Sequence, residues 1–191
     1  VLVTGSSRGI GRAIALDLAA AGYDLVLHYH SRLDEARQVE TLVQEQGVGA
    51  RILQFDIAER EDVAAKLLAD IEAHGAYYGV VCNAALTRDN AFPAMSADDW
   101  DTVIRSNLDG FYNVLNPLIM PMVRRRKAGR IVTLASVSGL MGNRGQVNYS
   151  AAKAGTGADG NARKSKLSII ASVRARSCCT PRNWRKWSSP L

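Results

Sequence analysis

The chain has 191 residues, 47% of them hydrophobic and 6% aromatic, so we expect one ordinary globular core and no second full domain. No apolar run approaches the roughly 18 residues that span a bilayer, and no signal sequence opens the chain, which argues against a membrane protein and predicts a cytoplasmic one. The formal net charge of +6 is uneven, because residues 1–154 carry 16 Lys and Arg against 17 Asp and Glu, whereas residues 155–191 carry 8 against 1.

Short β-branched runs alternate with segments of helical period, a pattern typical of βαβ units around a buried parallel sheet. The predicted strands are residues 1–4, 24–29, 50–55, 78–82 and 130–135. The predicted helices lie near residues 10–22, 32–47, 59–74, 97–126 and from 147 onward. In the first helix, Ile10, Ile14 and Leu18 recur every four residues and predict an apolar stripe against the sheet. Val1 already lies in the first apolar run, so we expect a few residues to precede it.

Three glycines stand between the first strand and the first helix. Gly5, Gly9 and Gly11 lie in "VTGSSRGIGRA", which we call the glycine turn (residues 5–11). Residues without side chains let the backbone approach a pyrophosphate, and the helix N-terminus supplies free N–H donors. The alternative is an ordinary glycine-rich connection. The strand before and the helix after favour dinucleotide binding on an α/β fold, a Rossmann-like doubly wound parallel sheet.

The end of the second predicted strand indicates which cofactor is preferred. A carboxylate at this place usually holds a ribose 2′-hydroxyl, but "LHYHSR" contains none. Arg8 in the glycine turn and Arg32 supply positive charge that suits a 2′-phosphate, although Arg32 could simply be a solvated residue at a helix start. The sequence therefore favours NADPH over NADH.

Cysteines and histidines predict no metal site. Cys82 stands alone, Cys178 and Cys179 are adjacent, and no spacing brings four ligands together. His28 and His30 alternate on one predicted strand but have no third ligand nearby, so we interpret them as polar residues at a strand end.

Tyr149 and Lys153 are four residues apart on one predicted helix and project from the same face. The ammonium group favours the phenolate and so is expected to lower the pKa of the phenol. Tyr149 would then be a general acid for a carbonyl that receives a hydride. This spacing alone is a weak signal, and its surroundings strengthen it.

"TGSSRGIG" and "LASVSGLMGNRGQVNYSAAKAG" resemble the short-chain dehydrogenase/reductase family, and the second segment is similar to that of bacterial 3-oxoacyl-[acyl-carrier-protein] reductases. The resemblance implies that Ser136 hydrogen-bonds the substrate carbonyl and that Tyr149 donates the proton. It also implies that Lys153 tunes Tyr149 and binds the nicotinamide ribose, while Asn107 supports a water-linked proton path to Lys153. Ser138 is the competing serine, interpreted as a loop residue, and the alternative for Asn107 is a helix cap.

The resemblance also implies a set of cofactor-binding residues. Asp56 and Ile57 follow the third strand and are expected at the adenine, Asn83 ends the fourth strand, and a basic residue at Arg8 is associated with NADP. The full expected set is Gly5, Ser7, Arg8, Gly9, Ile10, Gly11, Asp56, Ile57, Asn83, Ala84, Tyr149 and Lys153.

Two further segments suggest an acyl carrier protein as partner. "TRDN" (87–90) matches the carrier-protein reductases, and Arg126 and Lys127 in "RRRK" (124–127) fall where those reductases dock the acidic carrier. The alternative is a solvated basic helix end. The family forms homo-tetramers through the long helix and the Tyr149 helix, an assembly that the divergent tail of this chain puts in question.

The resemblance covers residues 1 to about 155, which we assign to an NADP-binding domain that carries the reductase site. Residues 156–191 form a basic tail that does not match the family and is expected to be poorly ordered. The C-terminal strands of the family's sheet are therefore expected to be missing or replaced in this chain. Residues 167–173 could form one short strand. Cys82 and Ala85 are smaller departures from the family's NNAG motif.

We interpret the tail as the product of a reading-frame shift. The rival is a genuine tail in which Trp184 and Trp187, among basic residues, bind nucleic acid or an anionic membrane. We favour the frame shift, and so expect no membrane partner and do not favour a nucleic-acid partner. The predicted function is NADPH-dependent reduction of 3-oxoacyl-[acyl-carrier-protein] in fatty acid synthesis, impaired if the tail disrupts the fold. The alternatives are an inactive nucleotide-binding remnant and a protein that binds through its basic tail.

Overall fold

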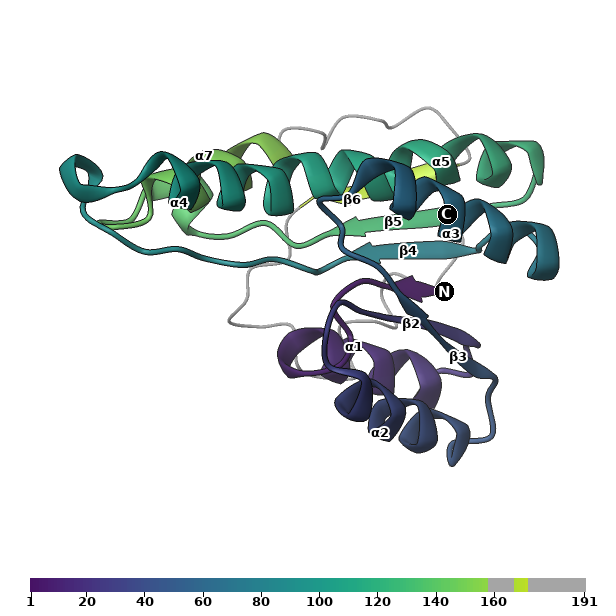
Figure 1. The fold of residues 1–191 in the computed structure, drawn as a ribbon. Coiled ribbons are helices and arrows are strands. Elements are labelled where there is room, and N and C mark those ends of the chain that lie inside the picture. The colour runs from purple at the N-terminus through teal and green to yellow at the C-terminus, as the bar shows by residue number, and fades with distance from the viewer. Residues whose placement is uncertain (158–166, 172–191) are drawn as a thin grey trace.

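A parallel sheet forms the centre of the molecule in the computed structural model, which describes residues 1–157 and 167–171 (Figure 1). Every neighbouring pair of strands is parallel, and the order is β3-β2-β1-β4-β5-β6. The strands are β1 (Leu2–Val3), β2 (Leu25–Tyr29), β3 (Ala50–Gln54), β4 (Gly79–Cys82), β5 (Gly129–Thr133) and β6 (Leu167–Ala171). The order reverses between β1 and β4, which confirms the doubly wound sheet predicted from the sequence.

Helices cover both faces of the sheet (Figure 1). On one face lie α1 (Gly9–Ala20) and α2 (Leu33–Gln44). On the other lie α3 (Arg60–His74), α4 (Ala97–Ile104), α5 (Gly110–Arg124) and α7 (Val147–Gly157). Leu2 joins the core under α3 and α5, whereas its neighbour Val3 joins the core under α1 and α2. Strands buried on both faces explain why their sequences are almost continuously apolar.

One detail of the predicted packing of α1 is wrong. Ile14 and Leu18 are buried against the sheet as predicted, but Ile10 is 49% exposed. β1 ends at Val3, and the intervening residues carry the start of α1 beyond the ends of the strands. Ile10 therefore has no strand beneath it, and it lies at the glycine turn instead.

The single long helix predicted over residues 97–126 is interrupted. A π-helical turn, η2 (Arg105–Asp109), separates α4 from α5. Such turns insert an extra residue into a helix and are frequent at functional sites. The sequence analysis also did not predict two short elements, the 3₁₀ turn η1 (Phe92–Ala94) and the helical turn α6 (Ser138–Met141).

β6 occupies the position beside β5, within the segment where one more short strand was predicted. A strand from the divergent part of the sequence thus takes the sixth place in the sheet. Most of the tail that was predicted to be poorly ordered, residues 158–166 and 172–191 with the two adjacent cysteines, lies outside the described ranges, whereas residues 156–157 end α7 and residues 167–171 form β6. Within those ranges, no helix combines the length and the apolar character needed to cross a membrane.

Candidate active site

The glycine turn begins after β1, at the carboxyl end of the strand, and runs into the first residues of α1. Gly5 has a φ of +64°, and a Cβ added there would lie 2.9 Å from the Cα of Ala84. A Cβ on Gly11 would lie only 2.2 Å from the carbonyl oxygen of Gly5. A side chain would collide with backbone at both positions, so the turn itself requires these glycines.

Thr4 and Asn83 bind the turn to the end of β4. The hydroxyl of Thr4 accepts hydrogen bonds from the N–H groups of Asn83 (2.9 Å) and Ala84 (3.0 Å). In return, the Asn83 amide donates to the carbonyls of Thr4 (2.9 Å) and Gly5 (3.1 Å). Asn83 and Ala84 therefore lie against the glycine turn, and their contact with a cofactor stays a prediction. The glycine spacing does not mark Thr4 as part of this site.

His28 holds the same turn from the side of β2, near whose end it lies as interpreted from the sequence, although the sequence did not indicate its burial. The residue is 2% exposed, and its Nδ1 accepts a hydrogen bond from the N–H of Gly5 at 3.0 Å. Its Nε2 lies 2.9 Å from the carbonyl oxygen of Phe55. Burial lowers the pKa of His28 to about 4, so the ring is neutral at neutral pH. Nothing in the sequence distinguishes this buried ring from His30, which is largely exposed.

The N-terminus of α1 has the features of an anion site. Arg8, its N-cap residue, makes no side-chain capping hydrogen bond with the described residues. Arg8, Gly9 and Ile10 are exposed, whereas Ser7 is largely buried within the turn. The first N–H groups of a helix lack intrahelical partners and carry partial positive charge, so they suit a phosphate group. The glycine turn thus fits the pyrophosphate of a dinucleotide.

The residues expected at the adenine differ in their surroundings. Asp56 is partly exposed, and its Oδ1 accepts a hydrogen bond from the N–H of Ala58 at 2.9 Å. Ile57 is 9% exposed and packs against Gly110, so a contact between its apolar side chain and an adenine ring is largely blocked. Arg32 pairs with Glu35 at 2.9 Å, which agrees with the alternative of a solvated helix-start residue.

Tyr149 and Lys153 lie on the same side of α7. The ammonium nitrogen of Lys153 is 5.7 Å from the centre of the Tyr149 ring and donates a hydrogen bond to the carbonyl of Leu134 at 2.9 Å. Lys153 is 6% exposed, and this burial lowers its pKa to about 8. Tyr149 remains partly exposed. A buried cation next to a reachable phenol is suited to proton transfer.

Ser136 is brought to this pair by the turn after β5. It follows Leu134 by two residues, and its hydroxyl accepts a hydrogen bond from the N–H of Ser138 at 3.2 Å. The Ser138 hydroxyl in turn donates to Gln146 at 3.4 Å, three residues before Tyr149. Ser138 is not a loop residue, as interpreted from the sequence, because it is the buried first residue of α6. Its backbone supports the Ser136 hydroxyl.

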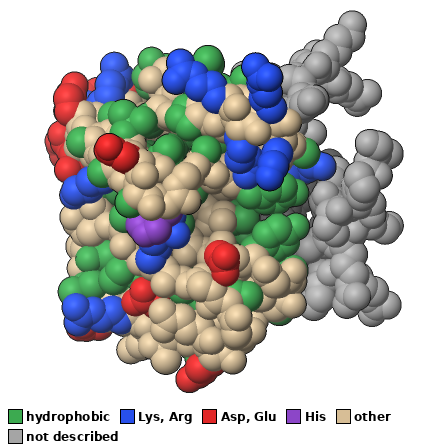
Figure 2. Space-filling view, turned by 90° about the vertical axis from the view of Figure 1, so that its right-hand side faces the viewer, with side chains coloured by type: hydrophobic (Ala, Val, Ile, Leu, Met, Phe, Trp, Pro, Cys, Tyr) green, Lys and Arg blue, Asp and Glu red, His purple; other side chains and the backbone are tan. Residues whose placement is uncertain are grey.

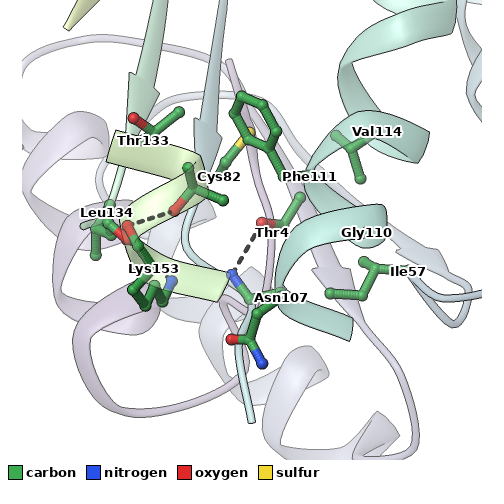
Figure 3. A pocket seen from close by; sticks show the side chains of 12 residues that line it. Thr4, Ile57, Cys82, Asn107, Gly110, Phe111, Val114, Thr133, Leu134 and Lys153 are labelled. Carbon is green, nitrogen blue, oxygen red and sulfur yellow. Dashed lines mark hydrogen bonds between the residues drawn. The ribbon is translucent and has the colours of Figure 1, made fainter. Parts of the chain in front are cut away.

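Asn107 lies in the π-helical turn η2, within a continuous helical stretch, and so does not cap a helix. Its Nδ2 donates to the carbonyls of Leu86 (2.8 Å) and Val103 (2.9 Å). Its Oδ1 and the Thr133 hydroxyl are both buried without a hydrogen-bond partner among the described residues. Both residues line a small cavity of about 20 Å³ together with Lys153 (Figure 3). A cavity of this size holds about one water molecule.

Two residues that the sequence analysis did not single out position the start of α7. Asn148 is fully buried, and its amide donates to the carbonyls of Arg88 (3.0 Å) and Asp99 (3.1 Å). Its Oδ1 accepts the N–H of Tyr149 at 2.8 Å. Gln146 donates to Asp89 at 2.7 Å. The segment "TRDN" therefore braces the helix that carries Tyr149.

The residues that the structure describes include no group of three or more His, Cys, Asp or Glu side chains that could hold a metal ion. The expectation of a site without a metal stays a prediction.

The family model for short chain dehydrogenases matches residues 1–162. The chain belongs to the short-chain dehydrogenase family. It is 68% identical over 155 residues to the 3-oxoacyl-[acyl-carrier-protein] reductase FabG of Aggregatibacter actinomycetemcomitans, which covers 81% of this chain and 64% of that relative. It is 40% identical over 154 residues to FabG of Staphylococcus aureus strain Mu50, covering 81% of this chain and 62% of that relative. The chain thus spans less than two thirds of the length of the curated relatives that it matches.

Proposed function

We propose that the chain is an NADPH-dependent reductase of 3-oxoacyl groups carried on acyl carrier protein, acting in cytoplasmic fatty acid synthesis. The observation that carries the proposal is that Lys153 lies beside the Tyr149 ring, donates a hydrogen bond to Leu134 two residues before Ser136, and lines one cavity with Asn107 and Thr4. The names of the relatives support the substrate, since both are 3-oxoacyl-[acyl-carrier-protein] reductases.

The preference for NADPH follows from the charges around the proposed ribose site. Tyr29 ends β2 and His30 follows it, so β2 itself places no carboxylate against a 2′-phosphate, and the nearby Asp56 carboxylate faces the imidazole of His30 at 3.6 Å. The exposed guanidinium of Arg8 supplies a cation at the start of α1. Arg32 contributes less than its sequence position suggested, because Glu35 neutralises it.

Side chains of the protein bind and protonate the carbonyl oxygen of the substrate. Bound NADPH would supply the hydride that adds to the carbonyl carbon. Ser136 donates a hydrogen bond to the carbonyl oxygen, and the N–H of Ser138 on its Oγ leaves the hydroxyl proton free for this task. Tyr149 then gives its phenol proton to that oxygen. Lys153 favours the resulting phenolate, and water in the cavity beside Asn107 returns a proton along Lys153.

Docking of the carrier protein is proposed at the end of α5. Lys and Arg side chains gather on the upper part of the face drawn in Figure 2, where α5 ends. The Lys and Arg residues at the end of α5 and in the segment that follows it, which we call the basic cluster, are Arg124, Arg125, Arg126, Lys127 and Arg130. Arg124 to Lys127 precede β5 and Arg130 lies within it, whereas Ser136 follows β5, whose five residues span about 16 Å. A carrier docked at Arg126 and Lys127 must therefore deliver its acyl group along the length of β5.

Two other functions remain as alternatives. An inactive remnant would bind NADPH without turnover, and a protein that acts through its basic tail would need neither. Residues 158–166 and 172–191, which carry most of that tail, lie outside the described ranges. The proposed boundary at residue 155 and the frame-shift hypothesis therefore stay predictions.

The test is to incubate the purified 191-residue chain with NADPH and a 3-oxoacyl thioester of acyl carrier protein, and to identify the product by mass spectrometry. The proposal expects the 3-hydroxyacyl thioester and stoichiometric loss of NADPH. Cofactor binding without product would instead favour the inactive remnant. Failure to bind NADPH would favour the third alternative, a protein that binds its partner through the basic tail.

A further inference from the structure

One buried histidine contacts both segments that form the proposed cofactor site. Nδ1 of His28 accepts the N–H of Gly5 at 3.0 Å. The backbone carbonyl of His28 accepts the N–H of Ser6 at 3.0 Å and the Ser6 hydroxyl at 3.3 Å. Three hydrogen bonds from two consecutive residues of the turn region therefore end on this one residue.

The other side of the ring is attached to the segment expected at the adenine. Nε2 of His28 lies 2.9 Å from the carbonyl oxygen of Phe55, and the two rings stack with their centres 4.0 Å apart. Phe55 directly precedes Asp56, so the ring of His28 joins the end of β3 to the glycine turn. A movement of the ring would shift both segments together.

A single protonation state makes both ring contacts. The N–H of Gly5 needs an acceptor at Nδ1, and the carbonyl of Phe55 needs a donor at Nε2, which is the neutral ring protonated on Nε2. The ring is too deeply buried to reach a ligand itself, at 2% exposure. Its contribution must therefore pass through the backbone that it holds. Asn83 fixes the carbonyl side of Gly5, so His28 completes the restraint from the N–H side.

We propose that His28 is a positioning residue for the cofactor, holding the glycine turn in the shape that binds the pyrophosphate and setting its place relative to Asp56. The proposal rests on the proposed function, because it takes NADPH as the ligand of the turn. A turn that already has its bound shape loses little conformational freedom on binding, and this raises affinity without any direct contact.

Two substitutions separate the two ring contacts. The Oδ1 of Asn and the Nδ1 of His are both bonded to Cγ, so they lie at similar distances from the backbone. His28→Asn therefore keeps an acceptor for the N–H of Gly5 and loses the donor to the carbonyl of Phe55. The amide nitrogen of Gln matches Nε2 in the same way, so His28→Gln keeps the Phe55 contact and loses that to Gly5. Tyr77→Phe is the matched control, because it removes a buried 2.6 Å hydrogen bond to Asp70 away from the glycine turn.

NADPH titrations and thermal unfolding without cofactor are measured on the full chain and all three variants. We expect His28→Gln to weaken NADPH binding about tenfold, His28→Asn about threefold, and Tyr77→Phe not at all, although all three lower stability. Equal affinities for the two His28 variants, or a reversed order, would overturn the proposal and leave His28 a structural residue.

Amide hydrogen exchange at Gly5 tests the positioning separately from the cofactor. Corrected for global stability, protection of this amide should persist in His28→Asn and fall in His28→Gln. Unchanged protection in His28→Gln would contradict the proposal whether or not NADPH binds. The wild-type chain could also fail to bind NADPH while Gly5 still loses its protection in His28→Gln. That outcome would support the positioning role of His28 and reject only the proposed function.

Discussion

Lys153 holds its ammonium nitrogen 5.7 Å from the centre of the Tyr149 ring. The same nitrogen donates a hydrogen bond to the carbonyl of Leu134, next to the turn that carries Ser136. One buried cation thus joins the helix and the strand that supply the proposed acid and the proposed oxygen donor. This arrangement has a cost, because a charged lysine at 6% exposure is poorly solvated.

That cost predicts a pH dependence of stability. Burial lowers the pKa of Lys153 to about 8, whereas the unfolded chain has its ordinary value of 10.5. Between these values the unfolded state binds more protons, so the free energy of unfolding rises with pH and is lowest below about 8. We expect this gain, up to about 3 kcal/mol, in the wild type but not in Lys153→Met. Urea denaturation of both proteins from pH 7 to pH 10 measures it, and parallel curves would contradict the prediction.

Gly11→Ala should damage the glycine turn. Its Cβ would lie 2.2 Å from the carbonyl oxygen of Gly5, a backbone atom that cannot move aside without opening the turn. We expect a loss of about 3 kcal/mol in stability and no measurable NADPH binding at concentrations that saturate the wild type. Gly157→Ala is the control, since its Cβ would meet nothing closer than 3.9 Å. Comparable losses in both variants would show that the close approach at Gly11 is not the cause.

An ion cluster remote from the glycine turn should affect stability alone. Arg51 donates to both carboxylate oxygens of Asp70, at 2.7 and 2.6 Å, and Tyr77 donates to the same carboxylate. Burial raises the pKa of Asp70, but these hydrogen bonds outweigh it and hold the pKa below its usual value. The cluster therefore stabilises the fold above the ordinary pKa of Asp, and this contribution is lost as the pH falls through the folded-state value.

Asp70→Asn should accordingly lower the free energy of unfolding by about 3 kcal/mol at pH 7, because Arg51 loses its buried counterion. Asp62→Asn, which breaks an exposed pair with Lys66, should cost less than about 1 kcal/mol. Chemical denaturation gives both values, and NADPH titration should show unchanged affinity for both variants. A weakened affinity in Asp70→Asn would mean that the cluster also supports the cofactor site.

Charge reversal in the basic cluster tests the docking proposal. Arg126 and Lys127 are exposed at the end of α5, so Arg126→Glu with Lys127→Glu should leave the fold intact. We expect KM for a substrate on acyl carrier protein to rise roughly tenfold at low salt, with kcat little changed. A small 3-oxoacyl thioester without the carrier is the control substrate and should be unaffected. An equal loss with both substrates would indicate damage to the site rather than to docking.

The sequence predicted the sheet well because its signals are local. Alternating apolar runs and helical periods mark β1 to β5 and the main helices to within a few residues, and the glycine spacing marks the turn. Family motifs then indicated Ser136, Tyr149 and Lys153, which the structure brings to one edge of the sheet. These features depend on residues close together in the chain.

What the sequence could not predict depends on distant contacts. In the sequence His28 looks like His30. The two differ only in the fold, where the glycine turn and the residue after β3 both contact the ring of His28. The π-helical turn at Asn107 leaves no periodic signal over five residues, so the two helices looked like one. Asn148 is an unremarkable polar residue until Arg88 and Asp99 bring their carbonyls to it.

The most direct measurement compares the wild-type chain with Tyr149→Phe in single-turnover reduction of a 3-oxoacyl thioester on acyl carrier protein. The substitution removes one hydroxyl and keeps the ring beside Lys153. We predict conversion to the 3-hydroxyacyl thioester by the wild type and a rate at least about a hundredfold lower in the variant, with NADPH affinity unchanged. Equal rates in the two proteins would contradict the role of Tyr149 as proton donor, and no conversion by either would contradict reductase activity in this chain.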